Sequence, residues 1–284
     1  MPYLLSTAFD QFIERITIGG DLRATAKARR DKIAELLEGT IETLDIFPTG
    51  SLVRGTGLKG SSDIDMIAVL HFSKHIKGKT CIELLEDIRD VVSAYNAQIV
   101  RKNGQAVTLY FRTWPNVDLV PAKRVNLHDG GHEIQIPDAN TNEWIVTNPG
   151  AHDAAIKELP LRTRQLIRMA KCWNVAHSSY MRSFHIELAA LETGYTIIDG
   201  DYWAEDDWPY SLVEYFEKAL EITPTTRKIC FEYDMDDWLE LQSRLRRAKD
   251  LAYEAWRAAC NDDNATAMAK LRVLFGDRFP AYGD

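Results

Sequence analysis

The stretch GSLVRGTGLKGSSDIDMIAVL, residues 50–70, carries the clearest structural signal in the sequence. It follows the short apolar run TLDIF (Thr43–Phe47), which predicts a strand. A short helical turn is expected to open at Gly50 and Ser51, and a glycine-rich loop then leads into a second strand over Ser62–Leu70. Glycine allows the backbone to approach a ligand closely, and a helix N-terminus presents free N–H groups to anions. The stretch therefore predicts a cradle for phosphate groups, with the Ser51 hydroxyl as an additional donor.

Three aspartates stand at strand positions that suit metal binding. Asp63 and Asp65 are two residues apart on the predicted strand, so their side chains share one face. Ile64 and Met66 are then expected to point into the core. Asp118 stands in the later run VDLV, between two apolar residues that take the buried face. Three carboxylates can hold two divalent cations, Mg²⁺ or Mn²⁺, about 4 Å apart for an in-line displacement at phosphorus.

The joint pattern is more specific than either of its parts. A DxD pair by itself is common on exposed strands, and a Gly-Ser pair before a helix is usually only a cap. A glycine-rich loop, two carboxylates on one strand and a third on a later strand together predict the transfer of a phosphate-containing group. Arg54 and Lys59 flank the loop, where each can contact a phosphate or pair with a nearby carboxylate.

Composition excludes several classes of protein. Of the 284 residues, 45% are hydrophobic and 27% are charged, a balance typical of a globular chain rather than a disordered or fibrous one. The net charge of −8 makes the chain a poor candidate for wrapping duplex nucleic acid, because phosphate contacts dominate that affinity. Much of the negative charge lies in residues 197–240, which contain 13 acidic and 3 basic residues.

The sequence shows no signal for membrane insertion or export. No stretch approaches the roughly 20 consecutive apolar residues of a membrane span, and the N-terminus lacks the apolar run of a secretory signal. The cysteines are far apart and form no CxxC pair, which is typical of reduced thiols: Cys81, Cys172, Cys230 and Cys260. We therefore expect a cytoplasmic protein that does not bind membranes.

The pattern of predicted elements divides the chain into two lobes. Residues 1–145 are expected to mix helices with strands, beginning with a helix over Phe9–Ile16 and a long helix that Asp21 caps and Gly39 ends. Further strands are expected in AQIVRK, QAVTLYF and NVDLVPA, after a helix over Cys81–Tyr95. Residues 146–284 are expected to be mainly helical, because apolar residues recur there at i, i+3 and i+4. The segment HEIQIPDANTNEWIVTNPG between the lobes predicts an ordered crossover.

These residues resemble a known signature. Gly50-Ser51, Asp63 with Asp65, and Asp118 are similar to the nucleotidyltransferase motif of the polymerase-β superfamily, and within it to the bacterial cGAS/DncV-like nucleotidyltransferases. The resemblance covers most of the chain, from FDQFIERITI and GSLVRGTGLKGSSDID through VDLVPA and IPDANTNEWIVTNPGAH to LIRMAKCWN and RSFHIELAALE. It implies an α+β fold: a polymerase-β-like core, with a mixed sheet flanked by helices and a long N-terminal helix. It also implies a helical C-terminal lobe, with the active site in the cleft between the two.

The resemblance also implies roles for residues of the second lobe. Lys171 and Ser183 are expected to contact the donor triphosphate, and Phe184 to stack on the donor base. From the residues alone, Lys171 fits a solvated lysine on an amphipathic helix equally well. Phe184 likewise fits a core aromatic at the start of a helix. Glu187 is expected to face the helical lobe and is given no catalytic role.

The activity that the resemblance implies is metal-dependent and template-independent. Two nucleoside triphosphates, ATP, GTP or pyrimidine nucleotides, would be joined with release of pyrophosphate and closed into a cyclic di- or trinucleotide. Asp63 and Asp65 would ligate both metals, while Asp118 would complete the second metal's ligands and accept the proton of the attacking hydroxyl. The product would activate a separate effector protein in anti-phage signalling. The residues leave three alternatives open: a linear oligonucleotide synthase or RNA-tailing enzyme, a transferase acting on a protein or small molecule, and an inactive nucleotide-binding scaffold.

Overall fold

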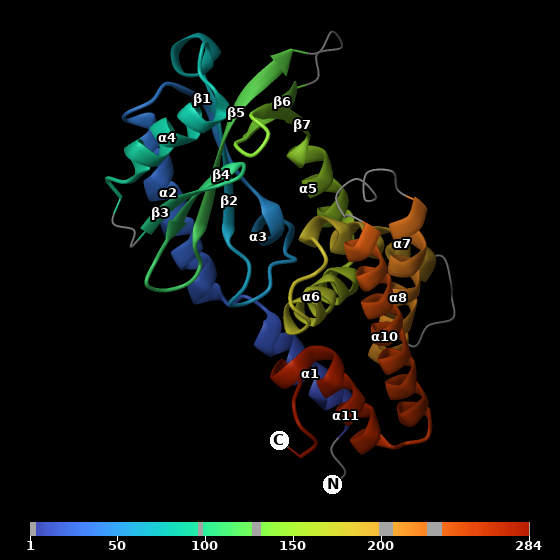
Figure 1. The fold of residues 1–284 in the computed structure, drawn as a ribbon. Coiled ribbons are helices and arrows are strands. Elements are labelled where there is room, and N and C mark those ends of the chain that lie inside the picture. Colours follow the sequence, from blue (N-terminus) through green and yellow to red (C-terminus); the bar gives the residue numbers. More distant parts are fainter. Residues whose placement is uncertain (1–3, 96–98, 127–131, 199–206, 226–234, 284) are drawn as a thin grey trace. The chain divides into compact units, whose positions relative to one another are not determined.

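The computed structural model describes residues 4–95, 99–126, 132–198, 207–225 and 235–283 (Figure 1). Parts of the acidic stretch 197–240, the first residues of AQIVRK and Cys230 lie outside the described residues. The chain forms two compact units. One, here called the sheet unit, is Ile18–Lys157, and the other, the helical unit, consists of Met1–Thr17 and Glu158–Asp284.

The described part of the sheet unit is built on a seven-stranded sheet, which is mixed as the resemblance implies, although the sequence predicts only five of its strands. Strands β1, β2, β5, β4 and β3 follow one another in that order, while β6 pairs with β5 and β7 with β6. Strands β2 and β5 are parallel, and the other pairs are antiparallel. Their bounds are β1 Thr43–Thr49, β2 Ile64–Leu70, β3 Ile99–Asn103, β4 Ala106–Tyr110, β5 Val117–Asn126, β6 His132–Asp138 and β7 Glu143–Thr147.

Helices cover one face of this sheet with a large apolar core. The helices of the unit are α2 Gly20–Glu38, α3 Gly50–Arg54, α4 Cys81–Val92 and α5 Pro149–Glu158, with a π-helical turn at Phe72–Ile76. Alternate side chains of a strand point to opposite faces, so Ile64 and Met66 pack with α2 and α4, whereas Ile67 and Val69 form a smaller core on the opposite face. Figure 1 shows α2 and α4 together on one side of the strands.

Two sequence predictions need correction in the sheet unit. The long second helix begins at Gly20 with Gly19 at its N-cap, so Asp21 lies in the first turn instead of capping the helix. The segment after β5 is more than a crossover, because residues 132–147 form the antiparallel pair β6 and β7 and continue into α5. Strand β5 extends beyond its neighbours β2 and β4, and β6 pairs with that extension.

The helical unit contains the remaining described helices. They are α1 Leu5–Ile16, α6 Leu161–Ala176, α7 Ser183–Ile198, α8 Trp208–Thr225, α10 Met235–Cys260 and α11 Asn264–Phe275, followed by a 3-10 turn at Gly276–Arg278. Helix α1 belongs to this unit because Phe9 and Phe12 pack on Phe279 and Phe275, with ring centroids 5.2 Å and 4.6 Å apart. Across the described ranges, no helix is both long and apolar enough to span a membrane.

Candidate active site

The register of three strands gathers the predicted carboxylates at one end of the sheet. Asp65 on β2 stands opposite Thr49 on β1 and opposite Asp118 on β5. Asp63 precedes β2, and its Oδ1 accepts a hydrogen bond from the backbone N–H of Asn116, the residue before β5, at 3.3 Å. The three aspartates therefore occupy adjoining positions, on the sheet face opposite to α2 and α4.

Gly50 lies directly against this carboxylate group. Its φ of +82° is in the left-handed region that disfavours side chains, and a Cβ added there would stand 1.8 Å from Asp65 Oδ2 and 2.8 Å from Asp65 Cβ. Because the Asp65 Cβ is itself so close, moving the far end of the Asp65 side chain would not make room. Glycine is thus needed at position 50 for its backbone conformation and because the Asp65 side chain fills the space that a Cβ would take.

Burial makes the negative charges of Asp63 and Asp118 costly at this end of the sheet. Loss of solvent raises the pKa of Asp63, and the nearby Asp118 carboxylate raises it further. Burial likewise raises the pKa of Asp118, against a hydrogen bond that its Oδ1 accepts from the Thr108 hydroxyl. The hydrogen-bond donors named here, a backbone amide and a hydroxyl, carry no full positive charge. Such a site attracts a cation.

The three aspartates are of the type that binds divalent cations, but their carboxylate oxygens do not converge on one point in this structure. In the part of the chain that the structure describes, no group of three or more His, Cys, Asp or Glu side chains is arranged to hold a metal ion. Carboxylate oxygens of Asp63 and Asp118 are engaged by Asn116 and Thr108. The donor set, three partly buried carboxylates at one sheet end, is nevertheless the chemistry that Mg²⁺ and Mn²⁺ prefer.

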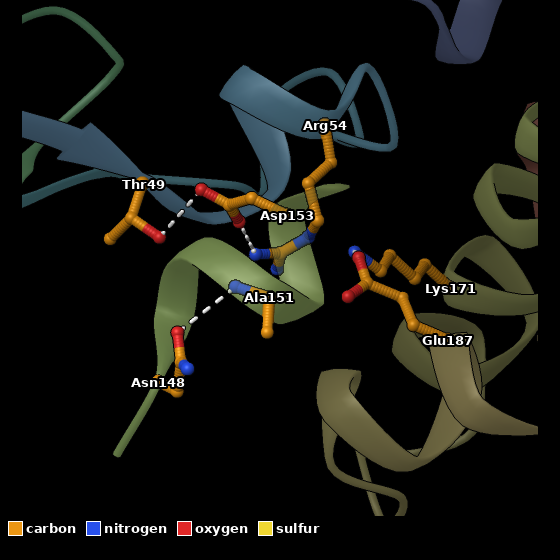
Figure 2. Close-up of polar contacts among 7 residues, drawn as sticks. All are labelled: Thr49, Arg54, Asn148, Ala151, Asp153, Lys171 and Glu187. Carbon is orange, nitrogen blue, oxygen red and sulfur yellow. Dashed lines mark hydrogen bonds and ion pairs between the residues drawn. The ribbon is translucent and has the colours of Figure 1, made fainter. Parts of the chain in front are cut away.

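The segment next to Gly50 is held by a buried ion pair (Figure 2). Ser51 is buried in the first turn of α3, and Arg54 is the last residue of that helix. Arg54 Nη1 stands 2.6 Å from Asp153 Oδ1 on α5. Of the two possibilities that the sequence leaves open for Arg54, the structure shows pairing with a carboxylate. Lys59, the other cation beside the loop, is exposed.

In the helical unit, Lys171 forms a buried ion pair with Glu187. Lys171 on α6 is only 4% exposed and Glu187 on α7 is 0% exposed, and Lys171 Nζ lies 2.7 Å from Glu187 Oε1 (Figure 2). The interpretation of Lys171 as a solvated lysine is therefore wrong. Glu187 faces the helical lobe as expected, but its partner is the lysine that the sequence singles out.

The other two predicted residues of this unit stand at the start of α7. Ser183 is the first residue of the helix and is exposed, and Phe184 is 45% exposed, so Phe184 is not a core aromatic. The turn before them is fixed by the Asn174 side chain, which donates to the Met181 carbonyl at 2.6 Å and accepts from the Met181 N–H at 2.8 Å. This amide clamp sets where α7 begins relative to α6.

The structure thus places the predicted residues in two sets. The sheet unit holds Gly50, Ser51, Asp63, Asp65 and Asp118 close together, and the helical unit holds Lys171, Ser183 and Phe184 on two neighbouring helices. Sequence reasoning missed four residues that contact these sets or their supports: Thr49, Thr108, Asn116 and Asp153. Thr108 had a signal, because it is a polar residue inside the apolar run AVTLYF. Asp153 had none nearby.

Comparison with known proteins agrees with this arrangement. The family model described as Second Messenger Oligonucleotide or Dinucleotide Synthetase domain, abbreviated SMODS, matches residues 4–159, more than half of the chain. No curated protein matches the chain.

Solved structures share the fold at low sequence identity. The CD-NTase CdnG of Bradyrhizobium diazoefficiens, solved with GTP, is 15% identical with a TM-score of 0.75, over 98% of this chain and 96% of CdnG. CdnC of E. coli MS115-1, solved with ATP, is 20% identical with a TM-score of 0.68, over 97% of this chain and 99% of CdnC. The GTP-bound form of Vibrio cholerae DncV is 13% identical with a TM-score of 0.58, over 95% of this chain and 78% of DncV.

These likenesses show a shared α+β fold, with a polymerase-β-like core and a helical part. The family match covers the sheet unit that carries the aspartates and Gly50. The chain belongs to the family of second messenger oligonucleotide or dinucleotide synthetases, and is a nucleotidyltransferase of that family.

Proposed function

We propose that this protein is a metal-dependent, template-independent nucleotidyltransferase that joins nucleoside triphosphates into a cyclic di- or trinucleotide with release of pyrophosphate. One observation carries the proposal: Asp65 and Asp118 are register partners at one end of the sheet, Asp63 lies beside them, and Gly50 lies against Asp65. Family membership supports a cyclic product. The catalytic chemistry is assigned to the lobe of residues 1–145, and further nucleotide contacts to residues 146–284.

The three aspartates would hold two Mg²⁺ or Mn²⁺ ions. Bound there, divalent cations supply positive charge that activates the attacking hydroxyl and neutralises the triphosphate and the leaving pyrophosphate. Asp118 is assigned the proton of the attacking ribose hydroxyl.

Five residues are assigned to the donor nucleotide. Gly50 brings the backbone close to the phosphates, Ser51 donates its hydroxyl, and the cation Lys171 contacts the triphosphate with Ser183. Phe184 stacks on the donor base, which agrees with its exposed ring. The substrates are nucleoside triphosphates, in agreement with relatives solved with GTP and with ATP. The setting we propose is bacterial anti-phage defence in the cytoplasm, where the product acts on a separate effector.

The test is synthesis by the purified protein. It is incubated with all four nucleoside triphosphates and Mg²⁺ or Mn²⁺, treated with phosphatase, and analysed by mass spectrometry for a phosphatase-resistant cyclic product. Asp63→Asn combined with Asp65→Asn is expected to reduce product at least about 1,000-fold, because both carboxylates are needed to hold charge at the phosphates.

The matched control is Asp31→Asn, because Asp31 pairs with Lys27 on the exposed surface of α2, and full activity is expected. Only phosphatase-sensitive products would instead indicate a linear oligonucleotide synthase. Full activity of the Asp63→Asn, Asp65→Asn protein would show that the site is misplaced.

A further inference from the structure

The Asp153 carboxylate contacts both ends of the nucleotide-binding segment, here defined as residues 49–54. Its position is set locally by the start of α5. Asn148 caps this helix by accepting a hydrogen bond from the Ala151 N–H at 3.1 Å, and Pro149 occupies the first helical position, where proline is favoured (Figure 2). These two residues fix the turn from which Asp153 projects.

The contacts of Asp153 are buried and specific. The residue is 8% exposed, and its two carboxylate oxygens have different donors. Oδ2 accepts from the Thr49 hydroxyl at 3.0 Å, and Oδ1 accepts from Arg54 Nη1 at 2.6 Å, a charge-assisted bond (Figure 2). Low exposure strengthens the attraction between the two charges, because solvent screens it less than at the surface.

The two donors enclose the predicted phosphate ligands. Thr49 immediately precedes Gly50, and Arg54 is the last residue of α3, so the Asp153 carboxylate fastens both ends of the segment that carries Gly50 and Ser51. Thr49 sits at the N-cap of α3, yet its side chain makes no capping hydrogen bond. Its hydroxyl is used for Asp153 instead. Thr49 is also the register partner of Asp65, so the same bond helps to fix Gly50 against Asp65.

We propose that Asp153 is a positioning residue for donor-nucleotide binding, acting through Thr49 and Arg54 on Gly50 and Ser51. The inference rests on the proposed function, since it takes Gly50 and Ser51 as contacts of the donor phosphates. It assigns Asp153 no contact with substrate. Loss of its carboxylate is expected to weaken nucleotide binding rather than the chemical step, because contacts to the donor phosphates exist before and during the reaction.

The experiment compares four variants of the full chain. Asp153→Asn removes the charge and keeps the shape, while Thr49→Val removes one donor and keeps the volume. Thr49→Ser is the conservative partner that retains the hydroxyl, and Asp31→Asn again controls for the loss of an exposed acid. Each protein is measured for kcat and KM of product formation, for binding of a fluorescent ATP analogue with Mg²⁺, and for thermal unfolding.

We expect Asp153→Asn and Thr49→Val to raise KM and the dissociation constant of the analogue by about tenfold, with kcat changed by less than about threefold. Thr49→Ser and Asp31→Asn should match the wild type. A purely structural role would lower the melting temperature and leave KM and analogue binding of the folded protein unchanged, and that result would overturn the inference.

The design separates this inference from the proposed function. If the wild type binds the analogue but makes no cyclic product, the proposed reaction fails, and the binding constants still decide the role of Asp153. If the wild type does not bind the analogue at all, both proposals fail. Should Asp153→Asn not fold, Thr49→Val and Thr49→Ser decide alone, because unchanged binding by Thr49→Val would contradict the inference.

Discussion

The candidate-site residues of the two units differ in how their buried carboxylates are compensated. In the sheet unit, Asp63 and Asp118 are held by neutral donors, and burial raises the pKa of each carboxyl. In the helical unit, Glu187 is more deeply buried, but it meets the Lys171 ammonium at 2.7 Å. The partners named for Asp63 and Asp118 include no cation, whereas the Glu187 carboxylate is matched by the Lys171 ammonium.

The difference indicates where the protein is prepared for a ligand. A buried acid without a nearby cation lowers stability and is tolerated where a bound cation compensates it. In a matched pair, the ammonium and the carboxylate instead compensate each other where neither is exposed to solvent. By this reasoning, Asp63 and Asp118 are suited to bind a cation from solution, whereas Glu187 already has a cation in Lys171.

Breaking the matched pair should have the largest effect on stability. Lys171→Met leaves Glu187 buried without its ammonium, and removing one partner of a buried pair costs about 3–5 kcal/mol of unfolding free energy. Denaturant unfolding measures this cost. Lys171→Met combined with Glu187→Leu should regain most of the stability but not the nucleotide binding. Lys27→Met breaks an exposed pair and should be nearly neutral; an equally mild result for Lys171→Met would refute the contrast between the units.

Gly50→Ala should come next, because it forces a methyl group into the space of Asp65. The positive φ costs about 1–2 kcal/mol for an L residue, and the clash adds about 1–3 kcal/mol. We also expect product formation to fall by about 100-fold or more, because Asp65 must move. Gly78 also has a positive φ, but no atom lies within 4 Å of a Cβ added there, so Gly78→Ala measures the backbone strain without a clash. Equal activity losses in the two variants would contradict a special role for the Gly50–Asp65 contact.

Neutralising an acid of the sheet should raise stability while abolishing activity. Asp118→Asn removes a buried negative charge and can still accept the Thr108 hydrogen bond. A carboxyl whose folded pKa is raised favours folding most below its ordinary value of 3.8, and this contribution is lost as pH rises through the folded pKa. The variant should therefore melt at about the wild-type temperature near pH 4 and several degrees higher near pH 7, in EDTA.

Addition of Mg²⁺ gives a second test of the Asp118 charge. Mg²⁺ should raise the melting temperature of the wild type near pH 7 and have much less effect on Asp118→Asn, because a ligand that binds only the folded state stabilises it. Asp31→Asn should respond to Mg²⁺ like the wild type. If the Asp118→Asn protein is less stable than the wild type in EDTA, the buried Asp118 carboxylate does not lower the stability of the fold.

The smallest effect concerns the reactivity of the buried thiol Cys172. It tests how strongly burial in the helical unit disfavours a negative charge, here a thiolate. Burial raises the pKa of Cys172 to about 12, whereas Cys260 is exposed. Iodoacetamide at pH 8 should modify Cys260 in the native protein and Cys172 only after denaturation, with no loss of activity. Peptide mass spectrometry reads both sites. Rapid labelling of native Cys172 would mean that burial there is weaker than the contrast requires.

Local sequence patterns predict the part of the site that lies on regular strands. The alternation through Asp63, Ile64, Asp65 and Met66 assigns the faces of β2, and both apolar residues are buried as expected. The apolar neighbours of Asp118 are also buried, so the sequence alone could predict that Asp65 and Asp118 lie on the same face of the sheet.

The rest of the site depends on contacts between distant segments. Arg54 and Asp153 are 99 residues apart, and nothing near either residue indicates the other. The Lys171–Glu187 pair depends on how the Asn174 amide clamp turns the chain between α6 and α7. Strands β6 and β7 were missed because Pro137 weakens a strand pattern and their pairing partner is the far end of β5.

The grouping of α1 with the C-terminal helices has a consequence for biosynthesis. Phe9 and Phe12 are translated before the sheet unit, but two of the rings that pack on them, Phe275 and Phe279, are translated after it. The sheet unit lies wholly between them and can fold as soon as it is translated. The apolar face of α1 therefore lacks these two aromatic contacts until the sheet unit and the helices that follow it have been made. Loss of residues 275–279 would remove two of the aromatic contacts of α1, whereas Trp208 on α8 would still stack on Phe9.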